Sequence, residues 1–109
     1  MRIIIETPDF KASPSLKTFI ESKVAKLEKL HKGIISAEIT LEIDVKKTKE
    51  VIRCTLILNI PGKDEYVKAS SSIFEDAILK AVEAAQRRLR IRKTQTLLDR
   101  KKGVKVKSR

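Results

Sequence analysis

Two segments in the middle of the chain alternate between apolar and polar residues, and this pattern restricts the fold more than any other. It runs through residues 34–46 and returns in residues 51–60. Such alternation is typical of β-strands with one buried and one solvated face. The apolar sets are Ala37, Ile39, Leu41, Ile43 and Val45 in the first segment, and Ile52, Cys54, Leu56, Leu58 and Ile60 in the second. Any second layer must therefore cover a single face of the sheet.

Two further strands are predicted at the start and in the second half of the chain. Residues 2–7 form a short β-branched run whose apolar residues do not alternate, which predicts a strand paired well inside the sheet. Residues 65–70 follow a Pro-Gly turn at residues 61–64 and predict a short strand with Val67 and Ala69 facing inward. The sheet is therefore expected to have four strands.

Two helices are predicted from apolar residues at helical spacing. The first covers residues 12–33, where Pro14 suits the first helical position and Gly33 suits a left-handed C-terminal cap. The second covers residues 71–93 and begins with a Ser-x-x-Glu capping box. Residues 96–109 lack a usable period, which predicts a flexible basic tail.

The order β-α-β-β-β-α predicts an α+β fold, a two-layer sandwich in which a four-stranded mixed sheet carries both helices on one face. The first two strands are joined through a helix and are expected to lie parallel, with a right-handed crossover. The later strands are expected to form an antiparallel meander. A chain of 109 residues suffices for one domain, which we place at residues 1–95, followed by the tail at residues 96–109.

The net charge of +11 is concentrated at one end of the chain. Residues 87–109 hold 11 basic residues and one acid, whereas residues 1–86 hold 14 basic and 13 acidic residues. The helix dipole stabilises only one or two cations in a final turn, and repulsion between i,i+4 cations is of similar size. A contact surface for a polyanion therefore explains the cluster better than a sheath over the end of the core does. The cluster consists of Arg87, Arg88, Arg90, Arg92 and Lys93.

Three lysines of the first helix extend this basic cluster. Lys23 falls inside the apolar sector of that helix, Lys26 borders the sector and Lys29 lies further round. If both helices lie side by side, the lysines join the residues 87–93 cluster in one basic strip, although Lys23 can also simply extend its methylenes over the core. The planar fork of arginine suits phosphate. With four aromatic residues and no Trp, structured RNA read by shape and backbone is the favoured ligand.

These features together resemble the ribosome hibernation promoting factor family, which includes the ribosome-associated inhibitor often called protein Y. The resemblance rests on the element order, on AKLEKLHKGIISAEITLEI and on KASSSIFEDAILKAVEAAQRRLRIRK. It implies binding to rRNA in the decoding channel of the small ribosomal subunit, where mRNA and tRNA would lie, and silencing of idle ribosomes in stationary phase or stress. The positions that match family RNA contacts are Lys23, Lys26, Lys29, Arg87, Arg88, Arg90 and Lys93.

Other classes of function receive no support from the residue pattern. His31 is the only histidine and Cys54 the only cysteine, so we expect no metal site, no cofactor, no intrachain disulfide and no enzymatic activity. No apolar run approaches the roughly 18 residues of a membrane span. The first residues also lack the pattern of a signal peptide. Together these features indicate a cytoplasmic protein.

Two alternative functions stay open at this point. One is a generic binder of structured or double-stranded RNA, whose domain shares a β-β-β-α core. The other is a regulator that docks on an acidic protein such as a sigma factor. Long members of the resembled family carry a further C-terminal domain that pairs two ribosomes, and 109 residues leave no room for it. We therefore expect a monomer that would need a second factor to pair ribosomes.

Overall fold

A four-stranded sheet forms the floor of the molecule. The computed structural model describes the backbone of residues 1–46 and 49–105, and the side chains of residues 1–45 and 49–92. Strand β1 pairs parallel with β2, while β2 with β3 and β3 with β4 pair antiparallel, as predicted. The strands lie in the order β1 (Arg2–Glu6), β2 (Ser36–Lys46), β3 (Lys49–Asn59) and β4 (Glu65–Ser71).

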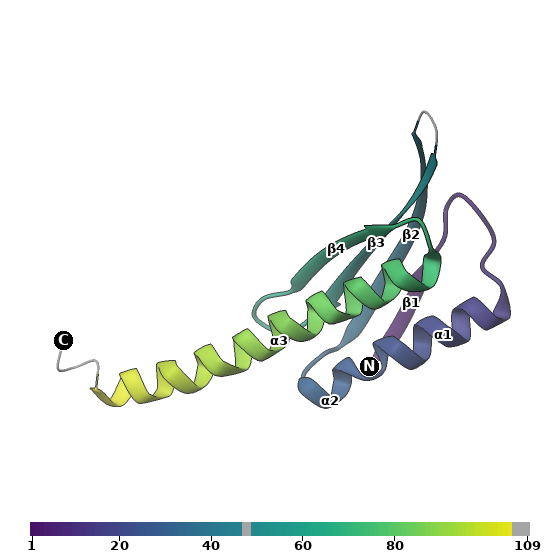
Figure 1. Cartoon of the computed structure of the whole chain (residues 1–109). Helices are drawn as coiled ribbons and strands as arrows, with labels where there is room; N and C mark the ends of the chain where they lie inside the picture. Colours follow the sequence, from purple (N-terminus) through teal and green to yellow (C-terminus); the bar gives the residue numbers. More distant parts are fainter. Residues whose placement is uncertain (47–48, 106–109) are drawn as a thin grey trace.

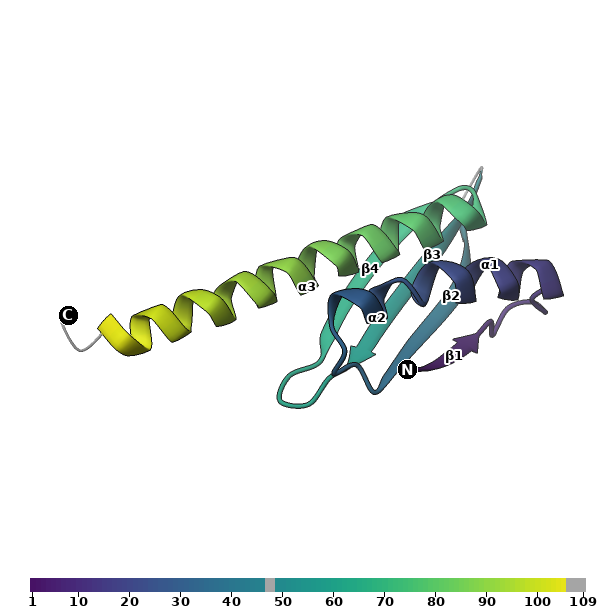
Figure 2. The same ribbon diagram turned by 90° about the horizontal axis from the view of Figure 1, so that it is seen from below.

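The helical layer covers one face of this sheet (Figures 1 and 2). Helix α1 (Pro14–Val24) contacts β1, and helix α3 (Phe74–Lys105) contacts β3 and β4. The short helix α2 (Leu27–Leu30) packs against α3. The predicted α+β sandwich, with its β-α-β-β-β-α order, is confirmed.

The core lies between the two layers and uses the side chains that the alternating pattern points inward, except Val45, which was predicted to face inward but is 73% exposed near the end of β2. Ile39, Leu41 and Leu56 are fully buried under the helices, which contribute Ile20 and Ile78 to the same core. Because burying an aliphatic side chain stabilises a fold by about 1.5–3 kcal/mol, a shift of either strand by one residue would move the whole set into water. The strand register therefore determines where the helices sit.

The helix predicted at residues 12–33 is shorter and is interrupted. Lys26 donates its backbone N–H to the carbonyl of Lys23, three residues back, which tightens the chain between α1 and α2 and keeps both Val24 and Leu27 fully buried. The left-handed cap predicted at Gly33 is wrong, since positive φ among the described residues occurs at Gly62 alone. Gly33 instead donates its N–H to His31 Nδ1, and an added Cβ would lie 2.8 Å from the His31 ring.

Two other boundaries differ from the prediction. β1 is an edge strand and does not lie inside the sheet, because the described strands after β2 all add on its other side. Helix α3 does not end at Lys93 but continues to Lys105, well beyond the sheet (Figure 1). Residues 96–109 show no usable helical period in the sequence, so this extension was not predicted.

Candidate nucleic-acid interface

Two buried leucines show how the helices are oriented over the sheet. Leu27 of α2 is 0% exposed and Leu89 of α3 is 1% exposed, so both point into the core. Successive residues of a helix are about 100° apart around its axis. The residues before and after each leucine therefore point toward opposite flanks of the helix.

One neighbour of each leucine contacts an edge of the sheet. Glu28 accepts a hydrogen bond from the Met1 amine, at the start of β1, over 2.6 Å. Arg88 donates from Nε to Glu65 Oε1 on β4 over 3.1 Å. Because β1 and β4 are the two edge strands, Glu28 and Arg88 mark the outer flanks of the helical layer.

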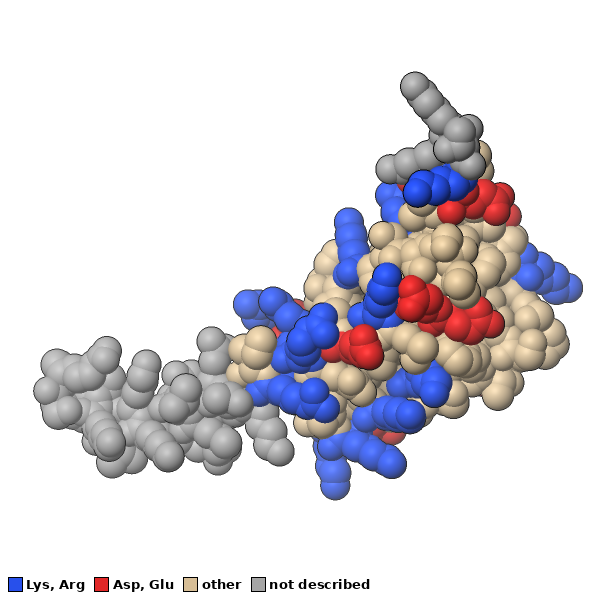
Figure 3. Space-filling view, in the orientation of Figure 1, with Lys and Arg blue, Asp and Glu red and all other residues tan. Residues whose placement is uncertain are grey.

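The other neighbours, Lys26 and Arg90, must then point inward, to the junction at which α2 packs against α3. Both residues are exposed. Lys29 and Arg87 lie two positions from the buried leucines and point away from the sheet, and they too are exposed. We call Lys26, Lys29, Arg87 and Arg90 the seam surface. Figure 3 shows basic side chains gathered around α2 and around the last described side chains of α3, with acidic side chains among them.

Lys23 lies beside this surface and is half-buried. Its Nζ is 5.5 Å from the centroid of the Phe19 ring, a distance at which the cation and the ring attract each other. Phe19 and Leu30, on the same flank, are also half-buried and pack on the core. The half-buried side chains on this flank agree with its orientation toward α3.

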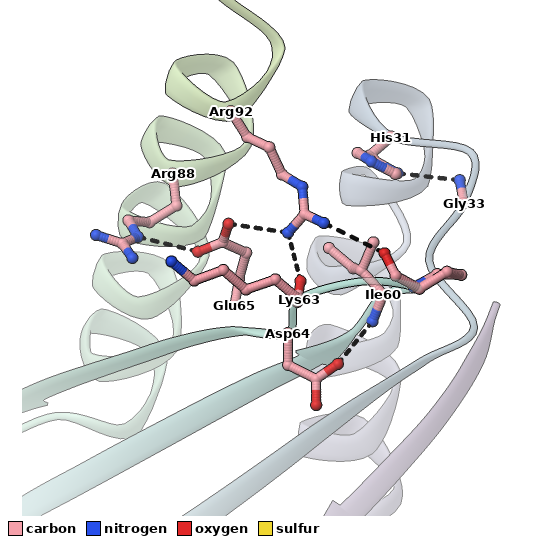
Figure 4. Close-up of polar contacts among 9 residues, drawn as sticks. His31, Gly33, Ile60, Lys63, Asp64, Glu65, Arg88 and Arg92 are labelled. Carbon is pink, nitrogen blue, oxygen red and sulfur yellow. Dashed lines mark hydrogen bonds and ion pairs between the residues drawn. The ribbon is translucent and has the colours of Figure 1, made fainter. Parts of the chain in front are cut away.

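Arg88 and Arg92 are directed to the opposite flank, where they share one carboxylate (Figure 4). Arg88 Nε lies 3.1 Å from Glu65 Oε1, and Arg92 Nη1 lies 3.1 Å from Glu65 Oε2. Arg92 also donates to the backbone carbonyls of Lys63 and Pro61. We call Arg88 and Arg92 the β4 flank of α3.

The structure therefore divides the predicted basic strip. Lys26 and Arg90 lie on the flanks of α2 and α3 that face each other, with Lys23 beside them, and Lys29 and Arg87 lie on the outer faces of the two helices. Arg88 and Arg92, expected in the same strip, contact β4 and the β3–β4 turn instead, because Glu65 attracts them there. The side chain of Lys93 lies outside the described residues.

Glu65 is the residue that sequence reasoning missed. It is only 6% exposed. Its position in β4 has the same parity as Val67 and Ala69, so the alternating pattern already directs it inward. A carboxylate that faces a core requires a charged or hydrogen-bonding partner. That requirement was the signal from which an arginine partner on the covering helix could have been inferred.

Two ionisable groups outside these surfaces have shifted pKa values. Burial raises the pKa of the Cys54 thiol to about 12, so the thiol stays protonated within the core. The hydrogen bond from Ser71, followed by that from Lys80, lowers the pKa of Asp76 at the start of α3. Among the described residues, no group of His, Cys, Asp and Glu side chains is arranged to hold a metal ion. No helix in the described part of the chain is long and apolar enough to cross a membrane.

The fold is similar to two solved structures. The N-terminal domain of protein Y from Thermus thermophilus superposes with a TM-score of 0.72 at 20% identity, covering 82% of this chain and 96% of that one. A ribosomal subunit interface protein from Coxiella burnetii gives a TM-score of 0.71 at 18% identity, covering 86% of this chain and 99% of the other. At such identities the similarity establishes the fold alone.

The sequence itself identifies the family. None of the curated protein sequences matches the chain. The sequence model of one protein family, described as sigma 54 modulation protein / S30EA ribosomal protein, matches residues 3–96 and so spans all the described side chains that form the seam surface. That description names no enzymatic activity. Because the match covers most of its 109 residues, the chain belongs to the sigma 54 modulation protein / S30EA ribosomal protein family.

Proposed function

We propose that this protein binds rRNA of the small ribosomal subunit through the seam surface, in the decoding channel, and thereby keeps mRNA and tRNA away from idle ribosomes. The chain belongs to a family whose description includes a ribosomal protein, and this membership supports the proposal. So does the likeness to a Coxiella burnetii protein described as a ribosomal subunit interface protein. Regulation of translation through the ribosome is the function that these two observations share.

The observation that carries the proposal is the group of exposed cations that α2 and α3 present on either side of their junction. Within the described residues, the side chains of Lys26, Lys29, Arg87 and Arg90 form no ion pair and no hydrogen bond, while two acids of the same region, Glu28 and Glu65, are engaged elsewhere. Like charges at such spacing repel one another by some tenths of a kcal/mol per pair, so an external polyanion would relieve the repulsion. Glu28 is bonded to Met1, and Glu65 is bonded to Arg88 and Arg92.

Folded RNA suits this surface better as a ligand than the surface of another protein does. The cations project from two helices packed on one sheet, so the protein presents them in a fixed arrangement, and phosphates of folded RNA are equally fixed. Four neutralised phosphates predict that log K falls by about 3–4 for each tenfold rise in salt concentration. A much shallower slope would speak against this surface.

The test is sedimentation of the purified protein with purified small ribosomal subunits. We expect the protein to travel with the subunits, and the Lys26→Glu/Arg90→Glu variant to stay at the top of the gradient. The matched control is Lys11→Glu/Lys68→Glu, which makes the same change of charge at two exposed residues outside the seam. Equal loss of binding in both variants would reduce the proposal to a net-charge effect.

The decoding channel requires its own measurement. Subunits preloaded with an mRNA fragment and tRNA should take up less of the protein than empty subunits, because the ligands would occupy the same channel. Unchanged uptake would place the contact elsewhere on the subunit.

A second candidate function is modulation of a sigma factor, which the words "sigma 54 modulation" in the family description favour. In that case purified sigma 54 would bind this protein directly, and treatment with ribonuclease would leave the complex intact. Binding to sigma 54 that the seam substitutions do not weaken, without binding to small subunits, would replace the ribosomal proposal.

A further inference from the structure

A pocket of about 420 Å³ lies on the β4 flank of α3, on the other side of the helix from the seam surface. It opens between α3 and the turn that joins β3 to β4. Three cations and one acid line it, together with an isoleucine that is 57% exposed. The lining residues are Lys63, Glu65, Arg88, Ile91 and Arg92.

The turn that carries Lys63 is held in place from two sides. Arg92 donates hydrogen bonds to the carbonyls of Pro61 and Lys63, so the helix holds the turn directly. Within the turn, Asp64 Oδ1 accepts the N–H of Ile60 over 3.0 Å, and Gly62 adopts the positive φ that the bend requires. The carboxylate of Asp64 is thereby directed away from the pocket (Figure 4). Lys63 therefore projects from a preorganised turn.

Arg88 reaches the same pocket with part of its guanidinium unused. Nε bonds to Glu65, but neither Nη atom has a hydrogen-bond or ion-pair partner among the described residues, and the side chain is 54% exposed. In Figure 4 these nitrogens and the Lys63 ammonium lie on the same side of Glu65. Both carboxylate oxygens of Glu65 are already bonded, Oε1 to Arg88 and Oε2 to Arg92. The pocket therefore holds more positive charge than its single acid can offset.

We propose that this pocket is a second phosphate-binding site, in which Lys63 and the two Nη atoms of Arg88 hold one phosphodiester group of an RNA strand. Glu65 fixes the Nε edge of Arg88, which leaves the Nη edge directed outward for a bidentate contact. The exposed side chain of Ile91 offers an apolar surface to the adjoining ribose or base. This inference rests on the proposed function in taking RNA as the ligand, and it adds a contact on the opposite flank of α3.

The direct test is a nuclear magnetic resonance titration of the full chain with a 5′-phosphorylated uridine dinucleotide. We expect saturable shifts of the Arg88 Nε–Hε signal and of the Lys63 amide. Lys63→Ala should weaken the dinucleotide about threefold to fivefold, as for a solvent-exposed charge pair. The control Lys68→Ala removes the same charge from the open face of β4 and should leave the affinity within about 1.5-fold, because charges a Debye length away are screened.

Three results would overturn the site. They are the absence of saturable shifts at Arg88 and Lys63, equal weakening by Lys63→Ala and Lys68→Ala, and tighter binding of an Asp-rich tetrapeptide at the same signals. Inorganic phosphate at matched ionic strength should bind more weakly than the dinucleotide, since it gains nothing from Ile91. Equal affinity would overturn the assignment to a polynucleotide.

A sedimentation arm separates this inference from the proposed function. Lys63→Ala should reduce the slope of log K against log salt for small subunits by about 1. If wild-type protein binds subunits while Lys63→Ala leaves the slope unchanged, the second site is wrong and the seam proposal stands. If the dinucleotide shifts persist but wild-type protein does not bind subunits, the ribosomal proposal fails and the phosphate site stands.

Discussion

The two flanks of α3 use the same residue type in different ways. On the β4 flank, Arg88 and Arg92 share the buried carboxylate of Glu65 and help to attach the helix to the sheet. On the seam side, Arg87 and Arg90 have no bonded partner among the described residues. Arginines that stand together in one basic cluster of the sequence therefore do not share one role in the structure. The position of a single acid beneath the helix decides which of these arginines are bonded to the sheet and which have no carboxylate partner among the described residues.

Reversing both seam arginines should produce the largest effect. In the Arg87→Glu/Arg90→Glu variant we expect affinity for small subunits to fall at least about a hundredfold, because each charge-assisted contact is worth about 1.5–3 kcal/mol. The free energy of unfolding should change by less than about 1 kcal/mol, since both side chains are exposed. Sedimentation and urea denaturation measure the two quantities. If the variant lost as much free energy of unfolding as free energy of binding, the seam arginines would be structural like those of the β4 flank, and the contrast between the flanks would be wrong.

Removing the shared acid should mainly affect stability. Glu65→Ala leaves Arg92, whose side chain is only 22% exposed, without its carboxylate, and we expect a loss of about 2 kcal/mol in the free energy of unfolding. Urea denaturation measures it, with Glu21→Ala on the exposed surface of α1 as the control. Equal stability of the two variants would mean that the β4 flank is not structural.

Cys54 provides an independent measure of the same effect. Its thiol is fully buried and its pKa is raised to about 12, so alkylation requires opening of the fold. A loss of about 2 kcal/mol should accelerate iodoacetamide labelling of Glu65→Ala at neutral pH about thirtyfold over wild type. Rapid labelling of the native wild type would contradict the burial of this residue.

A smaller effect is expected from Arg88→Ala. Its side chain is 54% exposed, so solvent screens the pair with Glu65 and the loss of stability should stay below about 1 kcal/mol. Comparison with Arg92→Ala sharpens the contrast within the β4 flank, because Arg92 also holds the β3–β4 turn and should matter more. Larger destabilisation by Arg88→Ala than by Arg92→Ala in urea would reverse this ranking.

The smallest effect belongs to a pair far from both flanks, at the start of α3. The pKa of Asp76 is lowered by Ser71 and Lys80, so the stability it contributes is present above its unfolded pKa and disappears as pH falls through its folded pKa. Asp76→Asn should therefore be slightly less stable than wild type at neutral pH and equally stable in strong acid. Thermal denaturation across this pH range measures the difference, and a difference that grows toward acid would have the wrong sign.

Local pattern was enough to predict most of the fold. Alternation in residues 34–46 and 51–60 predicted two strands and, apart from Val45, their buried face, and helical spacing predicted the two helices that cover it. The β-α-β order then required the parallel pairing of β1 with β2. The prediction failed for two features that the local residue pattern does not record, namely the place of a strand within the sheet and the length of a helix beyond it. The edge position of β1 and the extension of α3 to Lys105 are both of that kind.

The sequence by itself also determined that five cations would stand together at residues 87–93. Only the tertiary structure decided which of the described arginines face the seam and which face β4. The residues on either side of Leu89 look equivalent in a helical pattern, because periodicity records distance from the core and not the identity of the neighbour. Glu65 makes the two sides different, because it bonds only to arginines on the β4 side. It lies 23 residues before Arg88 and 27 before Arg92 in the sequence, and the packing of α3 on β4 brings them into contact.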